Sequence, residues 1–324
     1  MHLNKLSSKI IGICVSIQTA VIICIITLLG FAANTVHGQQ SEPEKTPETT
    51  PASNAAPEST NKSENTDGIV MPIPRIKQQK QDINHYLAKE KVSPILAGPD
   101  DYLTIVNRYT SANSKGVAIL LPDWQQGATN PKAIHFLQES LPSHGWTTIT
   151  VQPDNKPANF PSSAIDSNEQ IEADKATIQA YKTKLSTMFK VLMTKAKEHP
   201  GVVLVIAQGN HAAMLVDLID NEQNEAANAL IMLSSFLDAN PSQQSAINNA
   251  FAQQVAQSEY PIFDVLLNYD HPLAITGAKE RLMYAKQEMK VYYRQRQLNN
   301  SNTGYYPEKE LIRQINSWLR AIGW

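Results

Sequence analysis

Four polar segments could carry chemistry, because each follows or faces an apolar run typical of a buried strand. They are PDWQQG at 122–127, QGNHAA at 208–213, NYDHP at 268–272 and SNTGYY at 301–306. The first three supply Asp123, His211, Asp270 and His271, and Asp238 follows another run. Carboxylates beside imidazoles can act as general acids and bases or hold a metal ion. No ligand-spaced motif such as His-Glu-x-x-His accompanies them, so we predict no metal and no cofactor.

The predicted strands and helices that must position these residues alternate along the chain. This alternation indicates an α/β domain with a mostly parallel sheet. Apolar runs predict buried strands, and a more polar run near the end predicts an edge strand. In parallel sheets, ligands bind beyond the carboxyl ends of the strands, so the polar segments should meet at one edge. The predicted strands are 117–121, 147–151, 202–207, 229–233, 262–267 and, at the edge, 290–294.

Helical periodicity lies between these strands. The longest pattern runs from Ile171 to Ala196 at steps of three or four residues, and only Asp174 breaks its apolar stripe. Ser167 and Gln170 before it form a capping box, and the last helix is predicted to begin at Pro307. The stretch 68–104 is ambiguous and fits a strand and a helix packed on the sheet edge.

Several pieces of the chain together resemble the α/β-hydrolase superfamily. More closely, they resemble a bacterial group of uncharacterised α/β-hydrolase-like proteins known as a domain of unknown function. The resemblance covers residues 86–324 and implies helices on both faces of the sheet, an elbow at 208–211, an oxyanion-type loop at 122–127, an acid near Asp270 and a base within 301–305. The pieces are AILLPDWQQG, HGWTTITVQPD, VVLVIAQGNHAAM, PIFDVLLNYDHP, VYYRQRQL and ELIRQINSWLRAIGW.

The chain departs from the hydrolase pattern where catalysis would begin. The superfamily carries its nucleophile in a Gly-x-Ser-x-Gly elbow, but the alignment places Gly209 at the nucleophile position. The following Asn210 offers an amide, which is not a nucleophile, and the late loop NNSNTGYY contains no histidine to accept a proton. We therefore expect a catalytically degenerate domain that is not an enzyme.

Candidate functional residues remain on this edge. If any catalysis survives, it would use His211, Asp270 and His271. The ligand-binding candidates are Asp123, Trp124, Gln208, Gly209, Asn210, His211 and Asp270. Structural interpretations of the same residues stay open: in these, His211 only caps the elbow and His271 only precedes a loop proline. For Trp124 the alternatives are a pocket wall and a core residue. Ser234 ends a strand that lacks an elbow to strain and expose it.

The sequence of the N-terminal part, residues 1–67, predicts that the protein is exported. Residues 10–33 are apolar and uncharged, long enough for a membrane span, and Lys5 and Lys9 precede them. The segment is either an uncleaved inner-membrane anchor or a signal peptide cleaved after Val36-His37-Gly38. Residues 39–67 are rich in Pro, Ser, Thr and Glu, which is typical of a disordered tether. We therefore divide the chain into 1–38, 39–67 and a domain at 68–324 on the periplasmic side of the inner membrane.

The amino-acid composition limits the classes of partner that the protein could bind. The chain has 28 Lys and Arg against 30 Asp and Glu, and this balance argues against a nucleic-acid binder. Both cysteines lie in the apolar segment, so the exported part has no disulfide. Three hypotheses follow: a degenerate domain that binds a small molecule or an envelope protein, an envelope hydrolase or esterase that uses a non-standard group, and a tethered scaffold of an envelope complex.

Overall fold

The computed structural model describes residues 72–220 and 227–324. Residues Ile69–Trp324 form one compact unit, and the sheet and the hydrophobic clusters reported below all lie within it. The predicted segments 1–38 and 39–67, with the apolar stretch 10–33, lie outside the described residues. Across 72–220 and 227–324, no helix combines the length and the apolar character that crossing a membrane requires.

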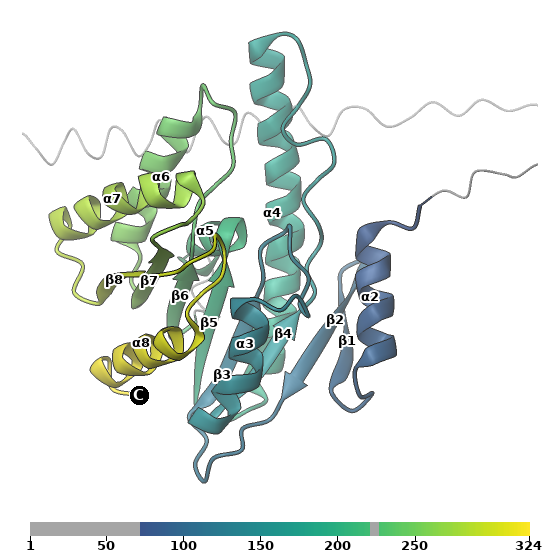
Figure 1. Ribbon diagram of the computed structural model, residues 1–324. Helices are drawn as coiled ribbons and strands as arrows, with labels where there is room; N and C mark the ends of the chain where they lie inside the picture. Colours follow the sequence, from purple (N-terminus) through teal and green to yellow (C-terminus); the bar gives the residue numbers. More distant parts are fainter. Residues whose placement is uncertain (1–71, 221–226) are drawn as a thin grey trace, which may run out of the picture. The chain divides into compact units, whose positions relative to one another are not determined.

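An eight-stranded sheet forms the centre of the described part (Figure 1). Its strands are β1 (Val92–Ala97), β2 (Asp100–Asn107), β3 (Gly116–Leu121), β4 (Trp146–Val151), β5 (Val202–Gln208), β6 (Ala229–Leu233), β7 (Ile262–Leu267) and β8 (Tyr293–Leu298). They lie in the order β1-β2-β4-β3-β5-β6-β7-β8. The six strands from β4 to β8 along this order are parallel, and β1 and β2 add an antiparallel edge. The mostly parallel sheet that the sequence predicts is confirmed.

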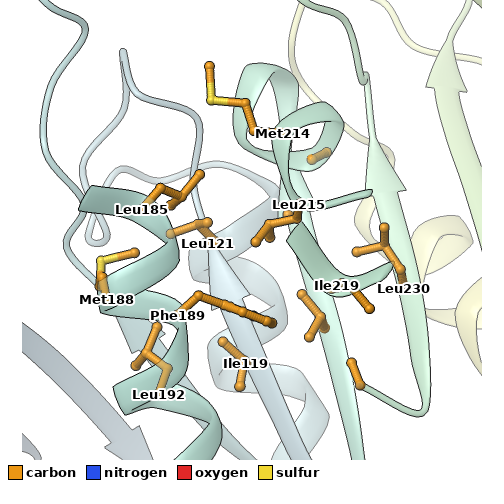
Figure 2. Packing of buried hydrophobic residues seen from close by; sticks show 14 of the residues in the cluster. Ile119, Leu121, Leu185, Met188, Phe189, Leu192, Met214, Leu215, Ile219 and Leu230 are labelled. Atoms are coloured by element: carbon orange, nitrogen blue, oxygen red, sulfur yellow. The ribbon is translucent and has the colours of Figure 1, made fainter. Parts of the chain in front are cut away.

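Helices cover both faces of the sheet, which is why its central strands are almost entirely buried and mostly apolar. One face carries α4 (Ser167–Lys197), α5 (Gly209–Asp220) and α6 (Gln244–Gln257), and the other carries α3 (Ala133–Ser140) and α8 (Glu308–Ala321). Along β3 the side chains alternate between the faces, so Ile119 and Leu121 enter one cluster and Ala118 and Leu120 the other. Figure 2 shows Ile119 and Leu121 beside Phe189 and its neighbours on α4.

The ambiguous stretch before β3 contains one helix and two strands. α2 (Arg75–Tyr86) precedes the β1-β2 hairpin, and its buried Ile83 packs against Leu103 and Ile105 of β2 and against Ala128. This small cluster holds the helix on the edge region of the sheet. The remaining described elements are η1 (Leu141–His144) and α7 (Pro272–Gln287), of which α7 packs against α6.

The edge strand begins three residues later than predicted. β8 runs over Tyr293–Leu298 rather than 290–294, although it is an edge strand that pairs with β7, as expected. The shift arises because the preceding residues still close the end of α7: the Lys290 N–H donates to the Ala285 carbonyl, and Met289 adopts a positive φ of 51°. A polar run at the edge has no burial pattern that would mark its start.

The cap of α4 also differs from the prediction. Asp166, not Ser167, is the N-cap residue, and its Oδ1 accepts hydrogen bonds from the N–H groups of Asn168 and Glu169 at 2.8 and 3.0 Å. Gln170 donates its side-chain N–H to the Ser162 carbonyl instead of closing a capping box. Aspartate is as effective a cap as serine, and its charge gains from the helix dipole.

Candidate functional site

The turn between β5 and α5 is a sharp elbow centred on Gly209. β5 ends at Gln208, and α5 begins at Gly209, whose φ is +58°. A Cβ built on Gly209 would lie 2.3 Å from Oδ1 and 2.6 Å from Cγ of Asp123. The elbow that the sequence predicts is therefore present, but the carboxylate of Asp123 fills the space where a nucleophilic side chain would begin.

Hydrogen bonds hold the Asp123 carboxylate in that position. Its Oδ1 accepts from the backbone N–H of Asn210 at 2.7 Å, and the Asn210 side-chain amide lies 3.4 Å from the same oxygen. Its Oδ2 accepts from the Gln125 N–H at 3.3 Å. In a hydrolase, backbone N–H groups of such a loop and elbow would be open to a substrate oxyanion. Here the Asn210 and Gln125 N–H groups serve a carboxylate of the protein itself.

His211 follows on α5 and is fully buried. Its Nδ1 lies 2.5 Å from the Pro122 carbonyl, which can only accept, so Nδ1 carries a proton. Its Nε2 lies 2.7 Å from the Tyr181 hydroxyl, which is also 2.8 Å from the Asp154 carbonyl. Burial lowers the pKa of His211, although the nearby Asp123 carboxylate opposes this effect. Both ring nitrogens therefore have hydrogen-bond partners, and the ring has no contact with solvent.

Trp124 and Gln208 complete the surroundings of the elbow as buried residues. The Trp124 ring is 1% exposed and packs edge-on against Tyr181, with ring centroids 5.5 Å apart. It also contacts Phe160 at 5.8 Å, so the structure assigns it to the core rather than to an open pocket wall. Gln208 is 4% exposed, and its Oε1 has no hydrogen-bond partner among the described residues.

A second cluster surrounds Asp270, at the position expected for the catalytic acid. The Ser234 hydroxyl donates to Asp270 Oδ2 at 2.7 Å, and the Leu267 N–H donates to the same oxygen at 2.8 Å. Since Ser234 has given its only proton to the carboxylate, the Tyr306 hydroxyl must donate to Ser234 Oγ, 2.5 Å away. Tyr306 is the last residue of the late loop NNSNTGYY, where a histidine base was sought, and no imidazole of the described residues joins these hydrogen bonds.

Ser234 differs from the sequence-based interpretation. It adopts φ +48°, a left-handed conformation that is uncommon for a residue with a side chain, so the backbone is strained there as at a functional turn. Its side chain is nevertheless 6% exposed. The prediction that the strand lacks strain at this exit is wrong, whereas the prediction that it does not expose the hydroxyl holds.

His271 lies at the surface, at the start of α7. It is the N-cap residue of α7, makes no side-chain cap, and stacks on Phe236 with ring centroids 4.1 Å apart. Its backbone N–H donates to Asp270 Oδ1 at 2.8 Å. The imidazole therefore contacts an aromatic ring rather than the carboxylate.

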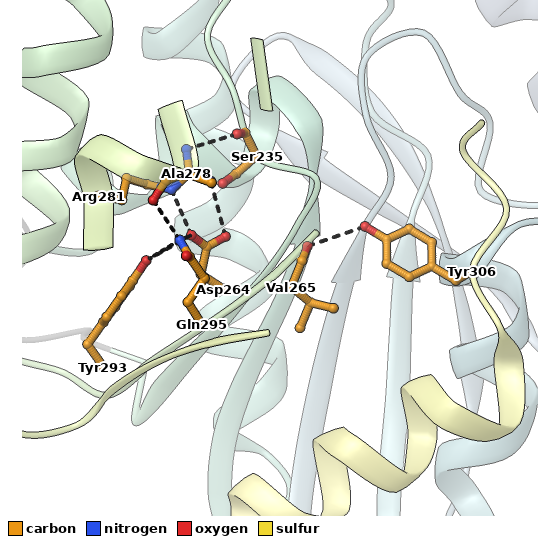
Figure 3. Close-up of polar contacts among 8 residues, drawn as sticks. All are labelled: Ser235, Asp264, Val265, Ala278, Arg281, Tyr293, Gln295 and Tyr306. Atoms are coloured by element: carbon orange, nitrogen blue, oxygen red, sulfur yellow. Dashed lines mark hydrogen bonds and ion pairs between the residues drawn. The ribbon is translucent and has the colours of Figure 1, made fainter. Parts of the chain in front are cut away.

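A buried ion pair stabilises the strands next to this cluster. Arg281 Nε donates to Asp264 Oδ2 at 2.7 Å, and the hydroxyl of Tyr293 and the amide of Gln295 donate to the same oxygen at 2.9 Å each (Figure 3). Figure 3 also shows the Tyr306 hydroxyl directed toward the carbonyl of Val265 on the same strand as Asp264. The Asp264 carboxylate is saturated by donors, so this network joins α7, β7 and β8 rather than forming a reactive site.

A pocket of about 380 Å³ lies beside the elbow. Its walls come from α4, from the loop after β6 and from α6, with Phe160 contributed by the loop before α4. Asp238 connects it to the elbow, because its side chain lines the pocket and its N–H donates to Asn210 Oδ1 at 2.8 Å. The molecule thus combines a filled nucleophile position with an open pocket next to it.

A protein-family model described as a protein of unknown function, DUF3530, matches residues 20–321. The chain belongs to the DUF3530 family. No curated protein matches the sequence. The predicted membership of an uncharacterised α/β-hydrolase-like family is confirmed.

Solved structures similar to this DUF3530 chain include Est1E and a dienelactone hydrolase. Est1E from Butyrivibrio proteoclasticus superposes with a TM-score of 0.52 at 10% identity, covering 71% of this chain and 98% of that one. A dienelactone hydrolase from Anabaena variabilis ATCC 29413 gives a TM-score of 0.50 at 10% identity, covering 71% and 96%. At such low identity the likeness establishes the fold alone, which is an α/β-hydrolase-like fold.

The DUF3530 structure separates the predicted site residues into two groups. Asp123, Asn210 and His211 come together at the elbow with Gln208 and Trp124 beside them, whereas Asp270 lies with Ser234 and Tyr306. In 72–220 and 227–324, no group of three metal-ligating side chains is placed to hold an ion. The carboxylate–imidazole cluster that Asp123, Asp238, Asp270, His211 and His271 could have formed is therefore not brought together as one group.

Sequence reasoning missed Tyr181, Asp154 and Tyr306. The hydroxyls of Tyr181 and Tyr306 are buried, and burial raises the pKa of both, with further contributions from Asp154 and Asp270 respectively. The only sequence signal for Tyr306 was its place in the late loop, where a histidine was sought instead. Nothing in the sequence marked Tyr181, which occupies an ordinary apolar position on a long helix.

Proposed function

We propose that this DUF3530 chain is a catalytically degenerate α/β-hydrolase-like domain, exported across the inner membrane, that acts by binding a small molecule or an envelope protein. The observation that carries the proposal is the pair Gly209 and Asp123. A glycine has no group that can attack a carbonyl, and the carboxylate 2.3 Å from its virtual Cβ leaves no space for one.

The remaining triad positions support the same proposal. His211 is the nearest imidazole to the elbow, but both of its nitrogens are engaged and its pKa is lowered by burial. Asp270 accepts from Ser234 and not from a histidine. General-base catalysis needs a base within hydrogen-bond reach of the group it deprotonates, and no imidazole of the described residues meets Ser234.

A domain without a nucleophile can still bind a ligand, and the pocket beside the elbow is a site where a small molecule could bind. Pockets of roughly 300–1,000 Å³ with mostly apolar walls and a few polar groups are typical of small-molecule sites.

The proposed periplasmic location, anchored or secreted, rests on the apolar segment 10–33, on Lys5 and Lys9 before it and on the acidic, proline-rich stretch that follows. A phosphatase reporter fused after residue 67 should be active on the periplasmic side, and an inactive fusion would contradict export.

Esterase activity of purified residues 69–324 tests the proposal. With p-nitrophenyl acetate and p-nitrophenyl butyrate we expect no turnover above the buffer rate and no labelling by a fluorophosphonate. His211→Ala and Asp270→Ala serve as matched controls, because they separate activity of this protein from that of a contaminating esterase. Turnover that disappears in either variant would overturn the degenerate assignment and favour an envelope hydrolase with a non-standard catalytic group.

A further inference from the structure

The pocket beside the elbow contains one acidic residue whose position the fold does not explain. Asp174 is the single charged residue in the apolar stripe of α4, and it lines the pocket. It is 8% exposed. Its Oδ1 accepts from the Ser162 N–H at 2.5 Å, but its Oδ2 is buried and has no hydrogen-bond partner among the described residues. A buried carboxylate oxygen without a partner is costly, so it needs a donor.

The other charged groups of the pocket already have partners. Asp238 pairs with Lys156, 3.0 Å away, and Lys182 lies 3.3 Å from Asp217. Lys175 lies 4.0 Å from Glu172, and 76% of its side chain is exposed, so it remains solvated. Within 72–220 and 227–324, Asp174 forms no ion pair of the kind that Asp238 forms. The unmet requirement of this pocket is therefore a positively charged hydrogen-bond donor.

The rest of the wall is largely apolar. Six large apolar side chains line the pocket: Phe160, Ile171, Ile178, Leu237, Ile247 and Phe251. A volume of about 380 Å³ is near the lower end of the range for small-molecule sites, which fits a single ring or a short chain. The apolar wall would exclude a ligand that is charged along its whole length, such as a polyamine or a sugar phosphate.

We propose that this pocket binds a small apolar molecule that carries one protonated amine, with the ammonium group at Asp174 Oδ2 and the apolar body against Phe160 and Ile178. The inference deepens the proposed binding function and rests on it. Because Oδ2 is itself buried, binding requires a small movement of the side chains that cover it. An ammonium would supply both the missing hydrogen bond and the missing counter-charge, whereas an alcohol supplies only the first.

Three probes with one body and different head groups test the inference on residues 69–324. They are 4-phenylbutylamine, 4-phenylbutanol and 4-phenylbutanoate, with affinity measured by calorimetry or by protein chemical shifts. We expect the amine to bind about tenfold or more tightly than the alcohol, and the carboxylate not to bind. Equal affinity of amine and alcohol, or tighter binding of the carboxylate, would overturn the proposal.

Three variants assign the effect to Asp174. Asp174→Asn keeps an acceptor for the Ser162 N–H and should weaken amine binding about tenfold, while Glu172→Gln, an exposed acid on the same helix, should change nothing. Ala250→Trp places a ring in the pocket from an exposed position and should abolish binding without touching Asp174. An amine affinity unchanged by both Asp174→Asn and Ala250→Trp would refute this site. Ester hydrolysis would overturn the proposed function instead, and it would leave the binding result unaffected.

Discussion

The replacement Gly209→Ala probes the central observation directly, because a methyl group at this position must displace the Asp123 carboxylate. Two costs add in the folded state. A residue with a Cβ at φ +58° loses roughly 1–2 kcal/mol relative to glycine. A Cβ 2.3 Å from Asp123 Oδ1 forces the carboxylate away from the Asn210 N–H, and a hydrogen bond to a charged group contributes roughly 1.5–3 kcal/mol. We therefore expect a loss of about 2.5–5 kcal/mol.

Gly98→Ala is the matched control for the backbone cost. Gly98 has a similar φ of +64°, but a Cβ there would meet only Thr187 Cγ2 at an ordinary 3.7 Å. Its replacement should cost about 1–2 kcal/mol, the backbone contribution alone. Urea unfolding of residues 69–324 measures both, with the slope of the transition checked for constancy.

A double variant then identifies the group that is displaced. In the background Asp123→Gly, the carboxylate is absent, so Gly209→Ala should cost only the backbone contribution of about 1–2 kcal/mol. The reasoning is refuted if Gly209→Ala costs no more than Gly98→Ala, or if its cost is the same with and without Asp123. Either result would mean that the nucleophile position is not filled by this carboxylate.

Two further predictions concern the buried polar groups. The pKa of His211 is lowered, chiefly by burial, so below about pH 6.5 the unfolded chain binds a proton that the folded chain does not bind. The free energy of unfolding should therefore keep its full value above about pH 6.5. Below that pH it should decrease by at most about 1.4 kcal/mol per pH unit. His211→Gln should flatten this dependence in urea unfolding between about pH 7 and 5, whereas the exposed His271→Gln should retain it, and an unchanged slope in His211→Gln would contradict the assignment. Ser234→Ala should destabilise the domain by about 1.5–3 kcal/mol through loss of the hydrogen bond to Asp270, and Ser234→Gly by about 1 kcal/mol less, since glycine relieves the strain at φ +48°. Thermal unfolding of the two variants gives this order, and a less stable Ser234→Gly would show that strain at this turn is absent.

The strands of this fold were predictable because their sequence signal is local. A parallel strand covered on both faces is buried along its length and is therefore mostly apolar. β3, β6 and β7 show this continuous burial, with Asp264 of β7 as the one charged exception among them. β8 was misplaced because its polar residues show neither continuous burial nor a regular alternation: the first three are partly buried, the next two are exposed and only the last is buried. The α4 cap was misassigned by one residue, since Asp166 and Ser167 are both acceptable caps and only the backbone geometry distinguishes them.

The candidate site was predictable only in part, for a similar reason. The elbow follows from a strand adjoining a helix, so Gly209 could be placed from neighbouring residues. The partners of the elbow could not, because Asp123 and Asn210 are 87 positions apart. Ser234 and Tyr306 are 72 positions apart, and their hydroxyls meet only because β6 and the segment before α8 meet in the fold.

The amino-acid sequence by itself determined the alternation of elements, the mostly parallel sheet and the absence of a nucleophile at residue 209. These properties depend on residue type and on periodicity along the chain, which burial imposes locally. Only the tertiary structure decided that Asp123 fills the vacant position, that His211 is closed off by Pro122 and Tyr181, and that Asp174 faces a pocket with one oxygen unpaired. Each of these depends on which side chains the packing of distant segments brings within hydrogen-bond distance, and short-range patterns along the chain do not contain that information.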